Sequence, residues 1–169
     1  MYQMVRPPDR HETDPEMKTT ITAERDMDAP AEVLYHLLAD YRTHHRPDGF
    51  LPPAFSDMQI HRGGLGAGTD VSWVNDLGGR RRTVRAQITE PRPGHTMVET
   101  ADGLVTTFTV EPTATGARVR FDTVIDESGV QGVLTRLFAP RMLAPIYADE
   151  LDRLAAHARD HGPLTGVVE

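Results

Sequence analysis

The chain has 169 residues, of which 38% are hydrophobic and none is cysteine, and its formal net charge is −7. This length favours one domain with a sizeable core, and the lack of cysteine excludes disulfides, thiolate metal sites and a cysteine nucleophile. The negative charge argues against a surface that binds nucleic acid. No apolar run approaches the ~20 residues of a membrane span. Residues 1–17 contain no apolar core of the kind that a secretory signal needs. We therefore expect a cytoplasmic protein without membrane insertion.

The two ends of the chain differ from the rest. Residues 1–17 mix prolines with charges and lack apolar periodicity, so we expect a disordered leader. Residues 18–161 are predicted to form the folded domain. Residues 162–169 begin with a glycine and a proline, which end helices, and are predicted to form a flexible tail.

The spacing of apolar residues changes from strand-like alternation to helical spacing over the first folded segments. Ile21, Ala23 and Met27 share one face of an alternating pattern, which predicts a half-buried strand over residues 19–27. Residues 31–41, with the sequence AEVLYHLLADY, place their apolar side chains at helical spacing and predict a short helix.

The irregular segment after this helix is GFLPPAF, residues 49–55. Its apolar side chains are Phe50, Leu51 and Phe55. They either plug one end of the core or form an apolar gate at the mouth of a pocket, because ligand pockets are lined mainly by apolar groups.

Short strands and tight turns alternate from residue 56 to residue 126. The turns Gly78-Gly79 and Asp102-Gly103 suit two-residue hairpins. Connections this short cannot hold a crossover helix, so neighbouring strands must pair antiparallel. With the first strand, these segments predict a seven-stranded sheet. The six predicted strands here span residues 56–62, 69–77, 80–90, 95–101, 104–111 and 117–126.

The longest helical pattern covers residues 130–161. Ser128 followed by Gln131 matches a capping box at its start. A mid-helix proline destabilises a helix by ~3 kcal/mol, so Pro140 and Pro145 predict a kink or break and two helices in sequence. A curved sheet that wraps this element would leave a pocket between sheet and helix.

This order of elements resembles the START-like, or SRPBCC, superfamily, and in particular its polyketide cyclase/dehydrase and lipid-transport subgroup. The stretches that carry the resemblance are TITAERDMDAPAEVLYHLLADY, GGLGAGTDVSW, LVTTFTVEP and LFAPRMLAPIYADELDRLAAHA. The resemblance implies an α+β helix-grip fold, in which a curved antiparallel sheet wraps a long C-terminal helix. Such families host ligand carriers, receptors and a few cyclases or dehydratases, so the fold does not determine the function.

Strand alternation selects candidate cavity residues. Polar groups on apolar faces need partners or mark a wet pocket. The alternation leaves the inward face of residues 95–101 and 104–111 ambiguous. The candidate ligand-binding residues are Trp73, Asn75, Arg82, Phe50, Leu51, Phe121, Leu137 and Tyr147.

Structural roles remain alternatives for several of these residues. Trp73 is the only tryptophan, and core packing would also explain it. Arg82 belongs to a run of three arginines beside a hairpin turn, where a solvated tip is the alternative to an anion site. Arg25 lies on an apolar face, and we expect it to pair with a neighbouring carboxylate.

An enzyme on this fold would need an acid or base with a shifted pKa inside the pocket. The candidates are Glu99, Tyr147 and Tyr35. Glu99 matters most, because an inward carboxylate needs a partner or a role. A carrier needs only an apolar cavity with one or two orienting polar groups.

We expect no metal site and no cofactor. His44 and His45 are adjacent and point in different directions, so they do not easily share one metal; a site closed by His61 or Asp48 is the alternative. The glycine loop at residues 63–68 precedes a strand rather than a helix, which argues against a phosphate cradle.

Together these observations predict binding or transport of a small hydrophobic ligand, such as a lipid, a polyketide or another aromatic or isoprenoid molecule. The first alternative is a polyketide cyclase/dehydratase-type enzyme without metal or nucleotide cofactor. The second is a protein-interaction module. We expect a monomer or weak homodimer.

Overall fold

The computed structural model describes the backbone of residues 18–126 and 130–161, and the side chains of residues 18–126 and 139–161. The predicted leader, the predicted tail and Ser128 lie outside these residues. So do the side chains of Gln131 and Leu137.

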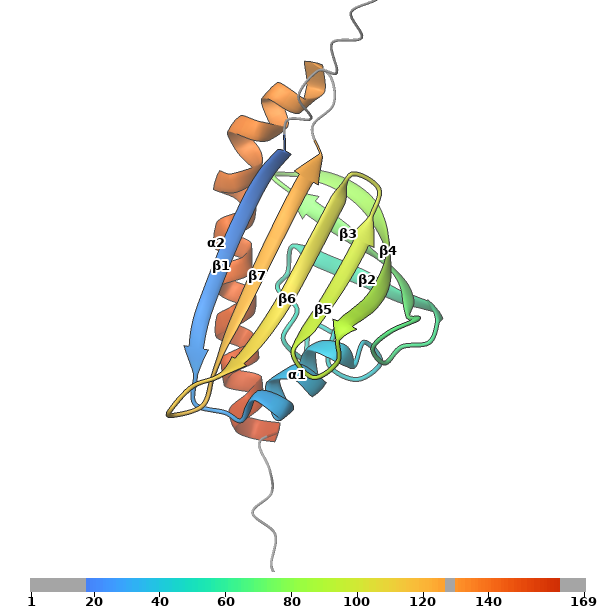
Figure 1. The fold of residues 1–169 in the computed structure, drawn as a ribbon. Helices are drawn as coiled ribbons and strands as arrows, with labels where there is room; N and C mark the ends of the chain where they lie inside the picture. Colours follow the sequence, from blue (N-terminus) through green and yellow to red (C-terminus); the bar gives the residue numbers. More distant parts are fainter. Residues whose placement is uncertain (1–17, 127–129, 162–169) are drawn as a thin grey trace, which may run out of the picture.

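Seven antiparallel strands form a single curved sheet, with the order β1-β7-β6-β5-β4-β3-β2. Figure 1 shows the long helix α2 lying behind the β1 side of the sheet and the short helix α1 near its lower end. The prediction of a seven-stranded helix-grip fold is therefore confirmed. The elements are β1 (Lys18–Met27), α1 (Ala31–Ala39), β2 (Phe55–Arg62), β3 (Asp70–Leu77), β4 (Arg80–Arg92), β5 (Thr96–Ala101), β6 (Leu104–Pro112), β7 (Ala117–Asp126) and α2 (Val130–His161).

The alternation of side chains along β7 explains how the sheet faces its core. Val119 and Phe121 are fully buried on the face toward α2. Arg118 and Arg120 point to the opposite face, and Arg118 makes an ion pair with Asp26 of β1 at 2.7 Å. Because successive side chains of a strand point to opposite faces, one register buries the apolar set and leaves the arginines in water.

Helix α2 is a single helix from Val130 to His161, so the prediction of two helices was wrong. Pro145 is exposed, and the carbonyl four residues earlier belongs to the exposed Arg141, which water can reach. Burial of Tyr147 and Leu151 against the sheet contributes about 1.5–3 kcal/mol for each side chain, enough to offset a proline penalty of ~3 kcal/mol.

Arg25 pairs across elements rather than within its own strand. Its guanidinium forms an ion pair with Asp152 of α2. We expected a partner on the same strand, and the pairing with a helix residue instead ties β1 to α2.

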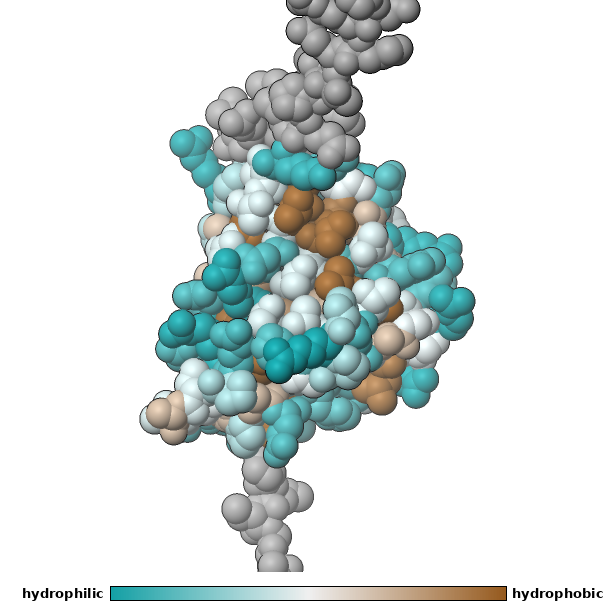
Figure 2. Space-filling model, in the orientation of Figure 1, coloured by the Kyte–Doolittle hydropathy of each residue, from teal (hydrophilic) through white to brown (hydrophobic). Residues whose placement is uncertain are grey.

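The face of the sheet away from α2 is mainly hydrophilic, with a small hydrophobic group in the upper part of Figure 2. On this side of β6, Val105 is 36% exposed and pairs in register with Val124 of β7. Over the residues described, no helix combines the length and the apolar character that crossing a membrane requires.

Candidate functional site: a cavity with two buried carboxyl groups

A small cavity of about 50 Å³ lies between the sheet and α2. It receives side chains from strands β2, β3, β5 and β6, from α2 and from the segment that follows α1. The lining residues are His45, Leu51, Phe55, Met58, Trp73, Asn75, Glu99, Leu104, Thr106, Phe108, Leu143, Tyr147 and Glu150.

An open cleft of about 550 Å³ adjoins this cavity. The two spaces share four lining residues, His45, Leu51, Phe55 and Met58. Leu51 comes from the irregular segment before β2, and Phe55 and Met58 come from β2 itself. The four side chains therefore form the wall between the buried cavity and the outside.

Glu99 points into the cavity from β5. Its neighbour two residues earlier, Met97, is also buried, while Thr100 is exposed, which settles the inward face of this strand. The hydroxyl of Tyr41 donates a hydrogen bond of 2.5 Å to Oε1 of Glu99. Burial raises the pKa of Glu99 to about 7, although the bond from Tyr41 acts in the opposite direction.

Glu150 is a second buried carboxyl group in the same cavity. It lies on α2 and is only 6% exposed. Among the side chains that the structure describes, none forms a hydrogen bond or ion pair with it. Burial, and then the charge of Glu99, raise the pKa of Glu150 well above its ordinary value, which favours the protonated form of its carboxyl group.

His45 is held as a neutral ring at the wall of the cavity. Its Nε2 lies 2.8 Å from the carbonyl oxygen of Leu38 and donates to it, since a carbonyl only accepts. Burial lowers the pKa of His45 to about 4. With Nε2 as the donor, Nδ1 carries the lone pair of the neutral ring. The ring stacks on Tyr41 with 4.0 Å between centroids, so it also orients the partner of Glu99.

Tyr147 closes a chain of three hydroxyl groups. Its hydroxyl lies 2.8 Å from that of Thr123, which in turn lies 2.9 Å from that of Thr106. Burial is the main cause that raises the pKa of Tyr147 to about 12. Tyr147 therefore stays protonated and can donate or accept a hydrogen bond within the cavity.

Trp73 and Asn75 supply the opposite wall. The indole Nε1 of Trp73 donates a hydrogen bond of 2.5 Å to Oδ1 of Asn75. This bond uses the carbonyl side of the amide and leaves its two N–H donors for other partners.

Known proteins share both sequence and fold with this chain. Residues 18–159 match the family described as polyketide cyclase / dehydrase and lipid transport. The chain belongs to this family. Among curated protein sequences, none matches the chain.

Solved structures of the superfamily agree with this assignment. The KanY protein is 30% identical, with a TM-score of 0.73, over 85% of this chain and 99% of its own. Norcoclaurine synthase from Thalictrum flavum is 17% identical, with a TM-score of 0.66, over 95% and 98%. Major latex-like protein 151 from Panax ginseng is 14% identical, with a TM-score of 0.65, over 83% and 97%. The last two show the fold alone.

Four of the site residues predicted from the sequence are not among those that line the cavity. Arg82 is exposed at the β3–β4 hairpin, in agreement with the solvated alternative. Phe50 is fully buried and packs on His45, with ring centroids 4.7 Å apart. Phe121 is also fully buried, at 4.7 Å from Phe108. The fourth residue is Tyr35.

Tyr35 holds a loop in place rather than facing the cavity. Its hydroxyl donates a hydrogen bond of 2.6 Å to Glu90, and the other carboxylate oxygen accepts 2.7 Å from the N–H of Ala67. Burial and the bond to Glu90 raise the pKa of Tyr35. In the glycine loop at residues 63–68, the N–H of Ala67 therefore binds the carboxylate of Glu90. Gly66 has a φ of +58°, a backbone conformation that glycine adopts most readily, and a Cβ there would also press on the Glu90 carboxylate.

The sequence did not select Glu150 or Tyr41 for this cavity, and it considered His45 only as a possible metal ligand. For Glu150 a signal was present, because it lies seven residues after Leu143 and three after Tyr147, on the apolar face of α2. Tyr41 shares the apolar spacing of the predicted helix, but no local pattern indicates its contact with Glu99. The residues around His45 have no regular period from which an inward direction could be deduced.

Proposed function

We propose that the protein binds a small, uncharged and mostly apolar molecule that carries a carbonyl or hydroxyl group. The observation that supports this proposal most is Glu150, a buried carboxyl group that faces the cavity without a described partner. Buried polar groups in native proteins are nearly always hydrogen-bonded. A ligand acceptor atom would give the protonated carboxyl group its missing partner.

The two carboxyl groups select against an anionic ligand. The raised pKa of Glu150 favours its neutral form, and Glu99, with a pKa of about 7, is ionised in part at neutral pH. A second negative charge in the same buried space would be strongly unfavourable. A neutral ketone, aldehyde, phenol or alcohol meets no such repulsion, so these classes fit better than a fatty-acid carboxylate.

Ligand entry needs movement of the wall. The cavity of about 50 Å³ is far smaller than the ~300–1,000 Å³ of small-molecule pockets, whereas the adjoining cleft of about 550 Å³ falls within that range. Displacement of Leu51 and Phe55 would join the two spaces. The apolar-gate interpretation of residues 49–55 thus becomes part of this proposal.

The test begins with native mass spectrometry of the protein purified from cells, to detect a retained small molecule. Hydroxybenzaldehyde and decanoate then serve as neutral and anionic probes, because norcoclaurine synthase of the same fold is described in complex with dopamine and hydroxybenzaldehyde. We expect hydroxybenzaldehyde to raise the melting temperature at pH 7 and decanoate to leave it unchanged. A stronger shift with decanoate would contradict the proposal.

Acid–base catalysis on a bound carbonyl compound is a second candidate. It is favoured by the pKa of Glu99, which lies near neutral pH, the range in which a general base or acid works best. In such a reaction Glu99 would take a proton from the carbon next to the carbonyl, while protonated Glu150 donates a hydrogen bond to the carbonyl oxygen. In a cyclase, the resulting enolate carbon then attacks a second carbonyl of the same molecule. In a dehydratase, the enolate expels a β-hydroxyl group, which takes the proton from Glu99 and leaves as water.

Two variants distinguish the carrier function from the enzyme function. Glu99→Gln keeps the acceptor for Tyr41 but cannot take a proton. If the protein is an enzyme, this variant abolishes turnover of a polyketide-type substrate and keeps its affinity. Tyr147→Phe should then reduce turnover as well. If wild type shows binding without turnover, the carrier function stands alone.

A further inference from the structure

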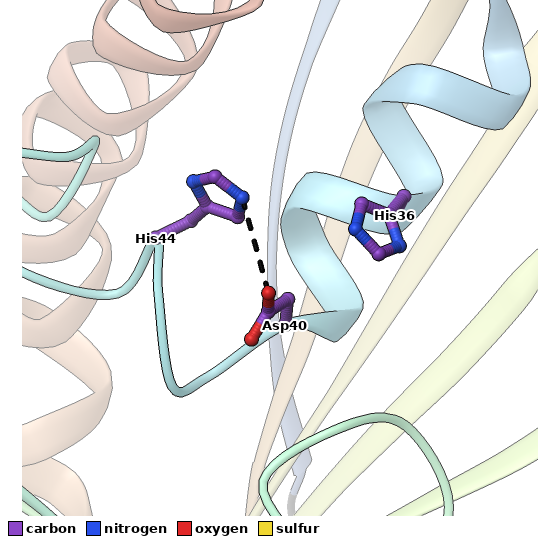
Figure 3. A group of neighbouring side chains, drawn as sticks. All are labelled: His36, Asp40 and His44. Carbon is purple, nitrogen blue, oxygen red and sulfur yellow. Dashed lines mark ion pairs between the residues drawn. The ribbon is translucent and has the colours of Figure 1, made fainter. Parts of the chain in front are cut away.

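A second group of polar side chains gathers outside the cavity, where α1 ends and meets the last turns of α2. His36, Asp40 and His44 each offer one ligand atom, and these three atoms lie within 4.8 Å of one another. Figure 3 shows the His44 ring and the Asp40 carboxylate facing each other, with His36 opposite on α1. The cavity-lining residues are a separate set.

The spacing of the three residues comes from the backbone. Asp40 donates its N–H to the carbonyl of His36 at 3.0 Å, and His44 donates its N–H to the carbonyl of Asp40 at 3.2 Å. Bonds between residues four apart keep the helical spacing beyond the end of α1 at Ala39. Side chains at such intervals stack on one face.

The ring of His44 is held from its other side by α2. A hydrogen bond of 2.9 Å joins Nδ1 of His44 to Nε2 of His157. The second nitrogen of the His44 ring, Nε2, lies 3.9 Å from a carboxylate oxygen of Asp40. A histidine that binds a metal is typically oriented by a hydrogen bond to its other nitrogen in this way.

His161 extends this arrangement by one turn of α2. Its Nδ1 donates to the carbonyl of His157 at 2.9 Å, so the lone pair of the neutral ring is on Nε2. The ring centroids of His44 and His161 are 5.6 Å apart. Four imidazoles and one carboxylate from two distant parts of the chain therefore meet at one place.

We propose that His36, Asp40 and His44 bind a divalent transition-metal ion such as zinc, with His157 as the residue that positions His44. Two imidazoles and a carboxylate are a donor set that zinc uses in proteins with one position left open. Zinc–ligand bonds of ~2.0–2.1 Å place tetrahedral ligand atoms about 3.4 Å apart. The pair His44–Asp40 is close to that separation, so the side chains need only a small inward movement.

The sequence had suggested a different histidine site. His45, there the partner of His44, donates instead to the carbonyl of Leu38, and His61 bonds to the hydroxyl of Ser72 at 2.8 Å. The site proposed here joins α1 to the segment that follows it, and it contacts the C-terminal turns of α2 through the hydrogen bond between His44 and His157.

The test is calorimetric titration of zinc chloride into the full chain without a polyhistidine tag. We expect one zinc ion per chain. His36→Gln and Asp40→Asn should each weaken binding, and the double variant should lose stoichiometric binding. His157→Gln should weaken binding by about 10- to 100-fold, the typical effect of losing an outer partner.

The control variant is His61→Gln, which should bind zinc as wild type does. His36 is exposed, so its replacement should leave folding intact, which circular dichroism checks. The proposal is overturned if wild type binds no zinc with defined stoichiometry. It is also overturned if the folded double variant binds zinc as tightly as wild type.

Discussion

Tyr41 donates a hydrogen bond of 2.5 Å to Oε1 of Glu99, and both side chains are buried between the sheet and α2. This pair connects the segment after α1 to β5. It places a carboxyl group with a pKa of about 7 at the wall of a cavity that also contains Glu150. The stability and the function of the protein should therefore both depend on these two carboxyl groups.

The pKa of Glu99 predicts how stability depends on pH. Its value is about 7 in the folded protein against 4.5 for an exposed group, so between these values only the folded chain keeps the proton. The free energy of unfolding therefore falls as pH rises from 4.5 to 7, by roughly 3 kcal/mol for this group. Glu99→Gln should remove this loss, so the variant gains stability over wild type with rising pH.

Urea unfolding at pH 5, 6, 7 and 8 measures this effect. The exposed Glu32→Gln keeps Glu99 and serves as the matched control: its difference in stability from wild type should stay constant across the series. A constant difference between Glu99→Gln and wild type across the series would show that Glu99 keeps an ordinary pKa.

Replacing Glu150 with an apolar residue should raise the stability of the protein and weaken ligand binding. Glu150→Leu removes a buried carboxyl group without a described partner and fills a similar volume with apolar atoms. We expect the variant to be more stable than wild type by roughly 1–3 kcal/mol at pH 8. It should also lose affinity for hydroxybenzaldehyde. A loss of stability at pH 8 would mean that Glu150 has a stabilising partner.

The bond from Tyr41 favours the ionised form of Glu99. Tyr41→Phe removes it and keeps the ring that stacks on His45. The pKa of Glu99 should therefore rise further, since burial then acts unopposed. Carbon-13 NMR titration of the Glu99 carboxyl group reports this pKa in both proteins. An unchanged or lower value in Tyr41→Phe would refute the role assigned to Tyr41.

Phe121 and Arg82 were both candidate ligand contacts. Their replacement by alanine should have very different effects on the free energy of unfolding. Phe121 has no exposed surface and packs edge-to-face with Phe108. Phe121→Ala should lower the free energy of unfolding by about 3–5 kcal/mol. Arg82→Ala, at an exposed hairpin, should change it by less than about 0.5 kcal/mol. Denaturant titration distinguishes the two, and a large effect of Arg82→Ala on stability would contradict its solvated placement.

Alternation made the sheet predictable from sequence. In β7 the buried Val119 and Phe121 alternate with arginines, so one register alone satisfies the pattern. Glu99 was ambiguous because β5 has apolar residues on both faces, and only pairing with its neighbours selects one. The continuity of α2 through Pro145 was unpredictable for a similar reason. It depends on tertiary packing, which local propensity does not include.

The cavity itself was less accessible to sequence reasoning than the fold. Its inward polar groups come from five separate parts of the chain, and Tyr41 reaches Glu99 across 58 positions of the chain. Glu150 could have been found from helical spacing, yet its neighbours Asp149 and Asp152 gave the surroundings the look of a solvated face. Pairings of this kind depend on how the helix meets the sheet.

The central claim is that the cavity with Glu99 and Glu150 binds a neutral, mostly apolar molecule. Trp73, the only tryptophan, lines this cavity, so its indole N–H gives one NMR resonance that reports directly on occupancy. Titration with hydroxybenzaldehyde should shift this resonance to saturation in wild type and in Val105→Phe, whose side chain lies on the outer face. Leu104→Phe, which fills the cavity, should abolish the shift. A resonance that does not move in wild type, or that moves equally in Leu104→Phe, would contradict the account.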